Sequence, residues 1–309
     1  MRANRSELAA TYSIVARDPA SGRLGVAVQS HYFSVGSVVT WAEPEVGAVA
    51  TQSFVDPSYG HLGLELMRSG RSAPETLAGL LAADADREVR QVAMVDAGGK
   101  VAAHTGARCI AEAGHIVGDG FSVQANMMHR NSVWSAMAEA YRGAAGDLPD
   151  RLMAALDAAE GEGGDIRGMQ SAAMLVVDRA RTGRPWADRV VDIRVEDAAH
   201  PLVELRRLLG IRRSYLARNL AEAAFARGEI EEGNRQYQLA EQLIGDNPEM
   251  RFWHAVALVN ARRIEQALPI FRDVFAKDRR WLELAERLVP LGRLRADPSL
   301  IATIRGVAH

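Results

Sequence analysis

The chain has 309 residues, enough for about two domains, and 48% of them are hydrophobic and 25% charged. This composition is typical of a folded protein and excludes wholesale disorder, collagen and coiled coil. The formal net charge of -2 provides no overall field toward nucleic acid or an anionic membrane, so we expect neither partner.

Lysine and cysteine are nearly absent, which limits the available chemistry. Lys100 and Lys277 are the only lysines, and Cys109 is the single cysteine. Arginine cannot replace lysine as a Schiff-base former or general base. One cysteine permits no intrachain disulfide and no cysteine zinc cluster. The chain also has no apolar run long enough to cross a bilayer, so we expect a cytoplasmic protein.

The first two thirds of the chain alternate between groups of strands and pairs of helices. Turn-forming residues at 18–22 and 96–99 separate pairs of apolar segments, which predicts hairpins. Strands joined by hairpins are antiparallel, so the order favours an α+β fold, a four-layer sandwich with helix pairs outside two sheets. The predicted strands span residues 12–16, 24–28, 37–41, 47–54, 89–95, 100–104, 121–127, 172–177 and 190–195, and the predicted helices span 62–69, 73–83, 133–142 and 152–160.

After residue 200 the pattern is helical only and repeats with a period of 34 residues. At this offset Gly233 matches Ala267, and Tyr237 matches Phe271. Small residues suit a close approach of two helices, and aromatic residues fill the groove between them. The pattern resembles the tetratricopeptide repeat. The predicted division is an extension over residues 1–10, a sandwich domain over 11–198 and a helical domain over 199–309.

Polar side chains gather at the ends of the predicted strands. Thr11 starts the first strand, and Asn126 ends a later one. Such residues can converge on one mouth of a sandwich and hold a hydroxyl nucleophile beside amide donors. The other members of this set are Ser30, His31, Thr51, Gln52, Asp56, His104 and Thr105. Taken singly, each of these others has an ordinary structural interpretation: threonine suits strands, an aspartate before proline forms turns, and a lone histidine is usually structural.

The standard cofactor-binding motifs and the nucleophile elbow of hydrolases are missing from the sequence. There is no phosphate-binding glycine loop, no dinucleotide fingerprint and no nucleophile elbow. A metal site built from His31, His104 or His115 is an alternative, but no pair of ligands has helical or hairpin spacing. We therefore expect neither a cofactor nor a metal.

Several blocks of the first domain resemble one bacterial family. They read TYSIVARDPASGRLGVAVQSHYFSVGSVV, GAVATQSFVDPSYG, REVRQVAMVDAGGKVAAHTGARC and FSVQANMM, and the match runs over residues 11–197. The resemblance is to the family known as domain of unknown function 1028, which is grouped with the N-terminal nucleophile (Ntn) hydrolases. It implies a four-layer αββα sandwich, in agreement with the order of the predicted elements.

The resemblance also implies a mechanism for Thr11. Ntn hydrolases attack an amide carbonyl with the first residue of the first strand, whose free α-amine acts as the base, and Thr11 occupies that position. Cleavage between Ala10 and Thr11 is required, because an acylated amine is not a base. Asn126 is then a candidate oxyanion donor. Members of the family commonly carry this threonine directly after the initiator methionine, whereas ten residues precede Thr11. In proteasome-type members a lysine supports the threonine, but no lysine lies between Thr11 and Arg90.

Two functions remain open at the level of sequence. The first is an amidohydrolase for a small amide or peptide-like substrate, with Thr11 and Asn126 catalytic and the other members of the polar set lining the pocket. The second is a non-catalytic ligand-binding or scaffold protein, in which the helical repeats hold a protein partner. A homo-oligomer is expected in either case, because a pair of repeats leaves an open end to be covered.

Overall fold

The computed structural model describes residues 7–9 and 11–308. The chain divides into two compact units, Met1–Arg207 and Leu208–His309. This division falls inside helix α6 (Pro201–Ala226), whereas the sequence places the boundary just before that helix. The predicted division into an extension, a sandwich domain and a helical domain stays a prediction. In the described part of the chain, no helix is long and apolar enough to span a membrane.

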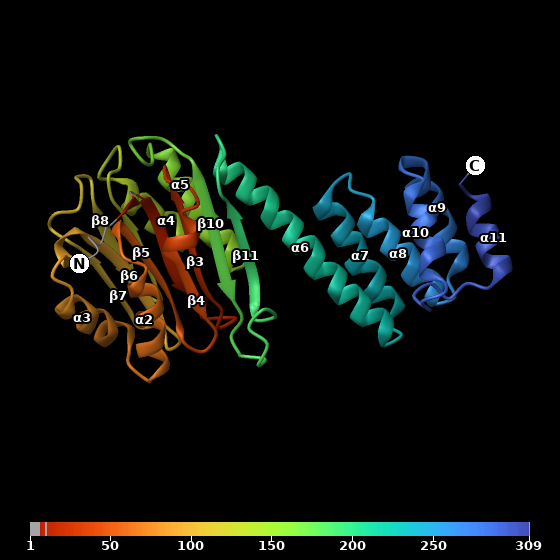
Figure 1. The fold of residues 1–309 in the computed structure, drawn as a ribbon, viewed down its shortest axis with the longest axis horizontal. Coiled ribbons are helices and arrows are strands. Elements are labelled where there is room, and N and C mark those ends of the chain that lie inside the picture. The colour runs from red at the N-terminus through yellow and green to blue at the C-terminus, as the bar shows by residue number, and fades with distance from the viewer. Residues whose placement is uncertain (1–6, 10, 309) are drawn as a thin grey trace, which may run out of the picture. The chain divides into compact units, whose positions relative to one another are not determined.

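Two antiparallel sheets form the framework of the first unit (Figure 1). In the first sheet, β5 pairs with β6 on one side and with both β1 and β4 on the other, and β7 follows β6. In the second sheet the strand order is β11-β10-β3-β2-β9-β8. The strands of the first sheet are β1 (Glu7–Ala9), β4 (Thr40–Glu43), β5 (Gly47–Val55), β6 (Arg90–Asp96) and β7 (Val101–Thr105). Those of the second are β2 (Thr11–Arg17), β3 (Leu24–Ser30), β8 (Gly114–Gly118), β9 (Phe121–Ala125), β10 (Ser171–Val177) and β11 (Arg189–Val195).

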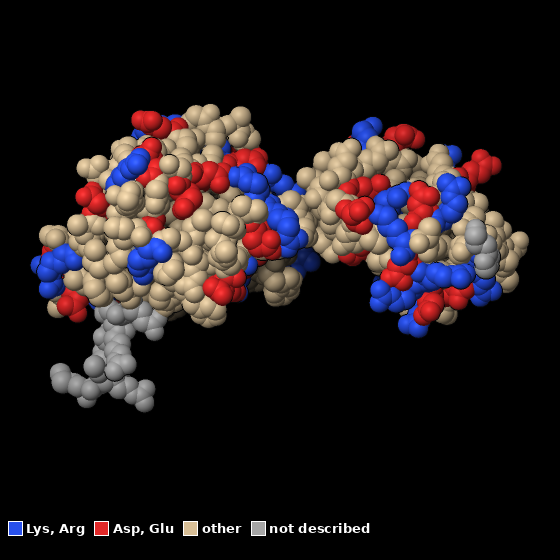
Figure 2. Space-filling view, turned by 90° about the horizontal axis from the view of Figure 1, so that it is seen from above, with Lys and Arg blue, Asp and Glu red and all other residues tan. Residues whose placement is uncertain are grey.

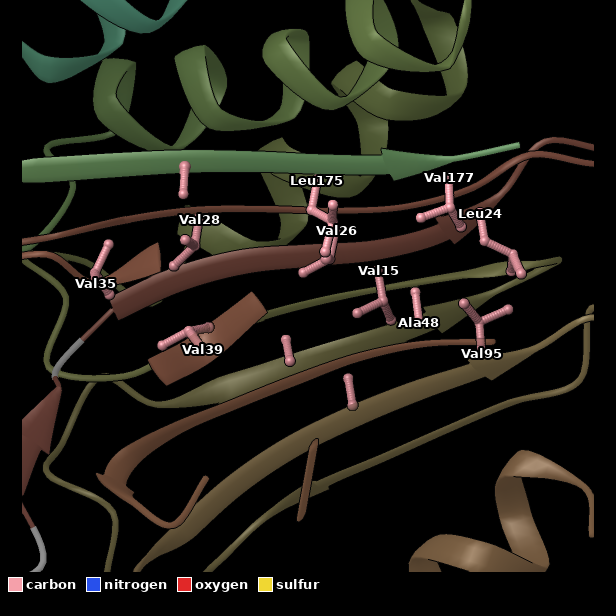
Figure 3. Packing of buried hydrophobic residues seen from close by; sticks show 13 residues of the cluster. Val15, Leu24, Val26, Val28, Val35, Val39, Ala48, Val95, Leu175 and Val177 are labelled. Atoms are coloured by element: carbon pink, nitrogen blue, oxygen red, sulfur yellow. The ribbon is translucent and has the colours of Figure 1, made fainter. Parts of the chain in front are cut away.

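Small and β-branched side chains fill the space between the two sheets (Figure 3). Val15, Val26 and Leu175 come from the second sheet, and Ala48 and Val95 come from the first. Side chains alternate between the two faces of a strand, so these contacts establish which face of each strand looks inward. This alternation decides which polar residues of each strand face the space between the sheets and meet at the site.

A pair of helices covers the outer face of each sheet (Figure 1). Helices α2 (Ser58–Arg68) and α3 (Ala73–Ala83) contact β5 and β6, and α4 (Val133–Gly143) and α5 (Leu148–Gly161) contact the second sheet. Helix α3 begins with a capping box between Ser72 and Glu75. The mixed architecture with antiparallel sheets, followed by a helical C-terminal region, is as the sequence predicts.

Four segments differ from the sequence-based expectation. Residues 37–41 were expected as one strand, but they contain the short helix α1 (Gly36–Val39) before β4. The turn is held by contacts that local sequence cannot reveal: the amide of Val35 donates to Ser171 Oγ at 3.0 Å. Strands β1 and β8 were not predicted, and a 3-10 helix (Arg87–Val89) delays the start of β6.

The second unit consists of helices packed around an aromatic core. Tyr237 and Phe271, matched by the sequence period, are both buried, and Phe271 stacks on Phe275 with ring centroids 5.2 Å apart. Gly233 lies against Phe225, where a Cβ atom would approach the ring to 2.4 Å. The helices that follow α6 are α7 (Ile230–Ile244), α8 (Glu249–Asn260), α9 (Ile264–Lys277), α10 (Arg280–Leu288) and α11 (Pro298–Gly306).

Candidate functional site

Thr11 begins β2 and faces the space between the sheets. It shares a face with Val15, which belongs to the inter-sheet core, and it pairs in register with Ser30 of β3. Both side chains are completely buried. The hydroxyl of Thr11 lies 2.7 Å from the carbonyl oxygen of Ala9, to which it donates, and 3.2 Å from Ser30 Oγ.

The backbone of Thr11 is held by several donors. Its carbonyl oxygen accepts from the amide of Asn126 at 3.0 Å, from Gln52 Nε2 at 3.2 Å and from Asn126 Nδ2 at 3.4 Å. Its own amide donates to the carbonyl oxygen of Asn126 at 3.4 Å. Gln52 comes from the opposite sheet, so both sheets fix the position of Thr11.

Gln91 of β6 is the centre of a buried amide network around Thr11. Its Oε1 accepts from Gln52 Nε2 at 2.7 Å and from Asn126 Nδ2 at 2.9 Å. Its Nε2 donates to the carbonyl oxygen of Ala125 at 2.9 Å and to Thr105 Oγ1 at 2.9 Å. Because buried amide groups are costly when unpaired, this network holds the amides next to Thr11 in defined orientations.

The network ends at His115 of β8. Thr105 Oγ1 lies 2.8 Å from His115 Nδ1. Burial, together with the nearby His104, lowers the pKa of His115 below its usual 6.5. A neutral imidazole can accept a hydrogen bond from the Thr105 hydroxyl, whose oxygen in turn accepts one from Gln91 Nε2. Gln91 is thus a donor to Thr105, and Thr105 is a donor to His115.

Ser13, Gln124 and Ser122 extend the polar network along the inner face of the second sheet. Ser13 Oγ donates to Gln52 Oε1 at 2.6 Å and accepts from Gln124 Nε2 at 2.6 Å. Ser122 Oγ donates to Gln124 Oε1 at 3.1 Å. These three residues therefore connect to Thr11 through Gln52, in one hydrogen-bonded network that joins the two sheets.

The predicted set divides between this network and other places. Ser30, Gln52, Thr105 and Asn126 meet around Thr11 as described.

Four other members of the set lie elsewhere. Thr51 is adjacent to Gln52 in β5, so its side chain points to the opposite face of the strand. Its hydroxyl donates to the carbonyl oxygen of Asp56 at 3.1 Å. Asp56 caps the turn by accepting from the amide of Ser58 at 3.0 Å. His104 lies 2.9 Å from the carbonyl oxygen of Arg87, on the other face of β7 from Thr105. The amide of His31 donates to Asp165 Oδ2 at 3.2 Å.

Sequence reasoning missed Gln91, the residue with the most contacts in the network. It is completely buried in β6 and directly precedes the apolar run 92–95. A long polar residue beside such a run inside a predicted strand is the signal that could have identified it. Asn126 was predicted to offer its amide to an oxyanion. In this structure Nδ2 is directed to Gln91 and to the Thr11 carbonyl, while Oδ1 has no hydrogen-bond partner among the described residues.

The described residues include no cluster of three His, Cys, Asp or Glu side chains placed to hold a metal ion. Charged groups lie outside the network, and acidic and basic side chains are interspersed on the face shown in Figure 2. The site consists of hydroxyl and amide groups and the imidazole of His115. Their chemistry is hydrogen bonding and, for a hydroxyl beside a base, nucleophilic attack.

Comparison with known proteins identifies the family. The model of the family of unknown function DUF1028 matches residues 11–205, so the chain belongs to this family. A solved structure of a DUF1028 protein from Silicibacter pomeroyi is 31% identical, with a TM-score of 0.58, and the match covers 65% of this chain and 88% of that one. A search of curated proteins finds no match.

Proposed function

We propose that this protein is an amidohydrolase for a small amide or peptide-like substrate, with Thr11 as nucleophile once residues 1–10 are removed. The position of Thr11 carries the proposal. It is the first residue of an internal strand, its hydroxyl adjoins Ser30, and its carbonyl oxygen accepts from three donors. A nucleophile held this firmly loses little conformational freedom on reaction.

The chemistry needs a free α-amine at Thr11. The amide nitrogen of Thr11 now donates to the carbonyl oxygen of Asn126, and a cleaved chain would place its amine there. An α-amine has a pKa of about 7.7–8.0, so it accepts the hydroxyl proton near neutral pH while Oγ1 bonds to the substrate carbonyl carbon. The C–N bond then breaks, the amine product leaves with that proton, and water hydrolyses the ester.

Asn126 and Gln52 support this proposal as positioning residues. Their side-chain amides both donate to the Thr11 carbonyl oxygen and both to Gln91 Oε1. The role of Asn126 as oxyanion donor requires its Nδ2 to leave Gln91, and it stays a prediction. The sandwich of two sheets between helix pairs supports an Ntn-type fold, and the matched burial of Tyr237 and Phe271 supports tetratricopeptide-like repeats.

Strand β1 covers Thr11 in the full chain. It pairs with the end of β5, from Ser53 to Val55, and its Ala9 accepts the bond from the Thr11 hydroxyl. Ala10, the other side of the bond that must be cleaved, lies outside the described residues. The proposal therefore predicts an inactive full chain and an active chain that begins at Thr11.

The experiment compares four purified proteins for hydrolysis of small amides and acylated amino acids. They are the full chain, the chain starting at Thr11, and that shorter chain with Thr11→Ala or Thr11→Ser. Intact-mass measurement first establishes where each chain begins. We expect turnover in the shorter chain, reduced turnover with serine and none with alanine. Thr76→Val in the shorter chain is the matched control, because it removes a completely buried hydroxyl of α3 that lies outside the polar network and should leave turnover intact.

Equal hydrolysis by all variants would remove Thr11 from the mechanism. Absence of turnover in every form, together with an uncleaved Ala10–Thr11 bond, would favour the second function, a ligand-binding or scaffold protein. The complete burial of Thr11 under β1 is the observation that supports this alternative. Homo-oligomerisation stays a prediction, and light scattering of the full chain tests it.

A further inference from the structure

A cavity of about 650 Å³ lies in the first unit, where β4 of one sheet contacts β10 of the other (Figure 1). Val177 of β10 lines it and pairs with Leu24, the first residue of β3. Thr11 pairs with Ser30, the last residue of β3. No member of the polar network around Thr11 lines the cavity. It is therefore a separate place in the fold, and the inference does not depend on the amidohydrolase proposal.

Trp41 of β4 provides an aromatic surface in this cavity. Its indole Nε1 donates to the carbonyl oxygen of Val38 at 3.0 Å. The ring also packs on helix α2, since a Cβ atom on Gly60 would lie 2.3 Å from it. Leu64 of α2 and Leu175 of β10 line the same cavity and are 8% exposed. The apolar part of the lining is thus held by the packing of the unit, as in a preformed ligand site.

Strand β11 brings charged side chains to the face of the second sheet that looks toward the first. Asp192 pairs with Leu175, and Arg194 pairs with Ala173. Paired residues lie on one face of a sheet, and both β10 residues belong to the inter-sheet core. The stem of Arg194 packs on Gly36, where a Cβ atom would lie 2.9 Å from its Cδ. Charged groups at such positions need a polar environment, and the cavity, which both line, supplies it.

The lining of the cavity carries more positive than negative groups. Glu43 serves two guanidinium groups, because it accepts from Arg68 Nε at 3.2 Å and lies 2.6 Å from Arg181 Nη2. Asp188 is buried, and its Oδ1 accepts from the amide and the hydroxyl of Thr182. The charged residues of the lining are Arg68, Arg181, Arg189 and Arg194, with Glu43, Asp188 and Asp192.

Two of these arginines keep donors for a ligand. Arg194 contacts Glu196 through Nε at 3.2 Å, and its Nη1 and Nη2 have no partner among the residues that the structure describes. Arg181 donates Nε to the carbonyl oxygen of Pro44 at 3.1 Å and lies 3.9 Å from the exposed Glu45, and within the described ranges its Nη1 has no partner. A guanidinium group with open donors is well suited to a carboxylate.

We propose that this cavity binds a small organic acid, with its carboxylate at the arginines of the lining and its apolar body at Trp41 and the two leucines. The excess of guanidinium groups favours an anion over a cation. The volume suits a small molecule. The apolar residues Trp41, Leu64 and Leu175 require that the acid also carries an apolar group.

Saturation-transfer NMR of the full chain tests the inference with three compounds that share one apolar body. They are phenylpropanoate, phenylpropanol and phenylpropylamine, which carry a negative, a neutral and a positive group. We expect saturable binding of phenylpropanoate, a Kd about tenfold higher for the alcohol, as expected when charge pairs are lost, and no saturable binding of the amine.

Variants then locate the binding site. R181Q/R194Q should raise the Kd of phenylpropanoate about tenfold. R179Q/R184Q is the charge-matched control, because it removes two exposed arginines of the same loop, 178–188, that do not line the cavity. It should change Kd less than about twofold.

Two further variants test the place of the apolar body. Ser37 is exposed and lines the cavity, so Ser37→Phe narrows it without a change of charge and should also raise Kd. Trp41→Phe should remove the change in tryptophan emission that phenylpropanoate causes in the full chain. Circular dichroism establishes that each variant is folded.

Several outcomes would overturn the inference. Absence of saturable binding of phenylpropanoate would mean that the cavity takes no such acid. Equal binding of the alcohol or the amine would mean that the arginines do not select the ligand. An equal effect of the two double variants would mean nonspecific attraction to positive charge, and an unchanged emission response in Trp41→Phe would place the ligand elsewhere.

Discussion

Replacing Gln91 by leucine tests whether the amide network stabilises the first unit. Gln91 is completely buried and accepts from two amide groups while it donates to three oxygen atoms. With leucine, Asn126 Nδ2 keeps only its long contact with the Thr11 carbonyl, and the carbonyl oxygen of Gly114 loses its bond from Gln91. Leaving about two buried groups poorly paired costs about 2–4 kcal/mol of unfolding free energy.

Thr76→Val is the matched control for this change. Thr76 is also completely buried, but its hydroxyl has no hydrogen-bond partner among the described residues. Valine has nearly the same shape, so removing this hydroxyl should change the unfolding free energy by less than about 1 kcal/mol or increase it. The two variants make the same kind of substitution, a buried polar group to an apolar one, with different expected results.

Urea unfolding followed by circular dichroism measures both effects. The transition midpoint should fall for Gln91→Leu with an unchanged slope, because the surface exposed on unfolding stays the same. A loss below about 1 kcal/mol for Gln91→Leu would refute the reasoning, and so would an equal loss for both variants. In either case the polar contacts between the sheets would not be a source of stability.

Three further predictions concern packing and pH. Phe271→Ala should destabilise the helical unit by about 3–5 kcal/mol in thermal or urea unfolding, whereas a change below about 0.5 kcal/mol would contradict its place in the core. The pKa of His115 is lowered mainly by burial, so the unfolded chain takes up the proton first. Stability should therefore fall as pH drops below about 6.5, and His115→Gln should flatten this pH profile. Gly60→Ala places a Cβ 2.3 Å from the Trp41 ring and should cost about 1–3 kcal/mol, whereas Gly79→Ala meets open space and should stabilise by about 0.5–1 kcal/mol.

Elements with strong local signals were predicted well. The turn at 18–22 joins β2 to β3 and the turn at 96–99 joins β6 to β7, because turn-forming residues act locally. Residues 37–41 were misread because their β-branched side chains favour a strand, while the helix there depends on Ser171, far away in sequence. β1 is three residues long and pairs with β5, which is far away in sequence. β8 pairs with the next strand, β9, across the turn Asp119-Gly120, a local hairpin signal that the sequence analysis did not use.

The candidate site was predicted in part, and parity explains the limit. Thr51 and Gln52 are adjacent and therefore point to opposite faces of β5, so only one of them can reach Thr11. The sequence analysis names both residues as site candidates, because the sequence does not reveal which face of the strand looks toward the other sheet. The structure decides for Gln52, because Ala48 and Ala50 on the same face belong to the inter-sheet core. Gln91 was missed for a different reason: it lies inside the predicted strand 89–95, whereas the sequence analysis collected polar residues at strand ends.

β1 and β4 pair with the same edge of β5. They therefore determine how much of that edge is unpaired in a chain that begins at Thr11. β4 covers the first part of β5, from Gly47 to Ala50, and β1 covers its last three residues, Ser53 to Val55. Loss of β1 would leave a window about 10 Å long, three residues at about 3.3 Å each. So short a free edge offers few unpaired backbone groups for pairing with a strand of another molecule. Its length equals that of a tripeptide in extended conformation.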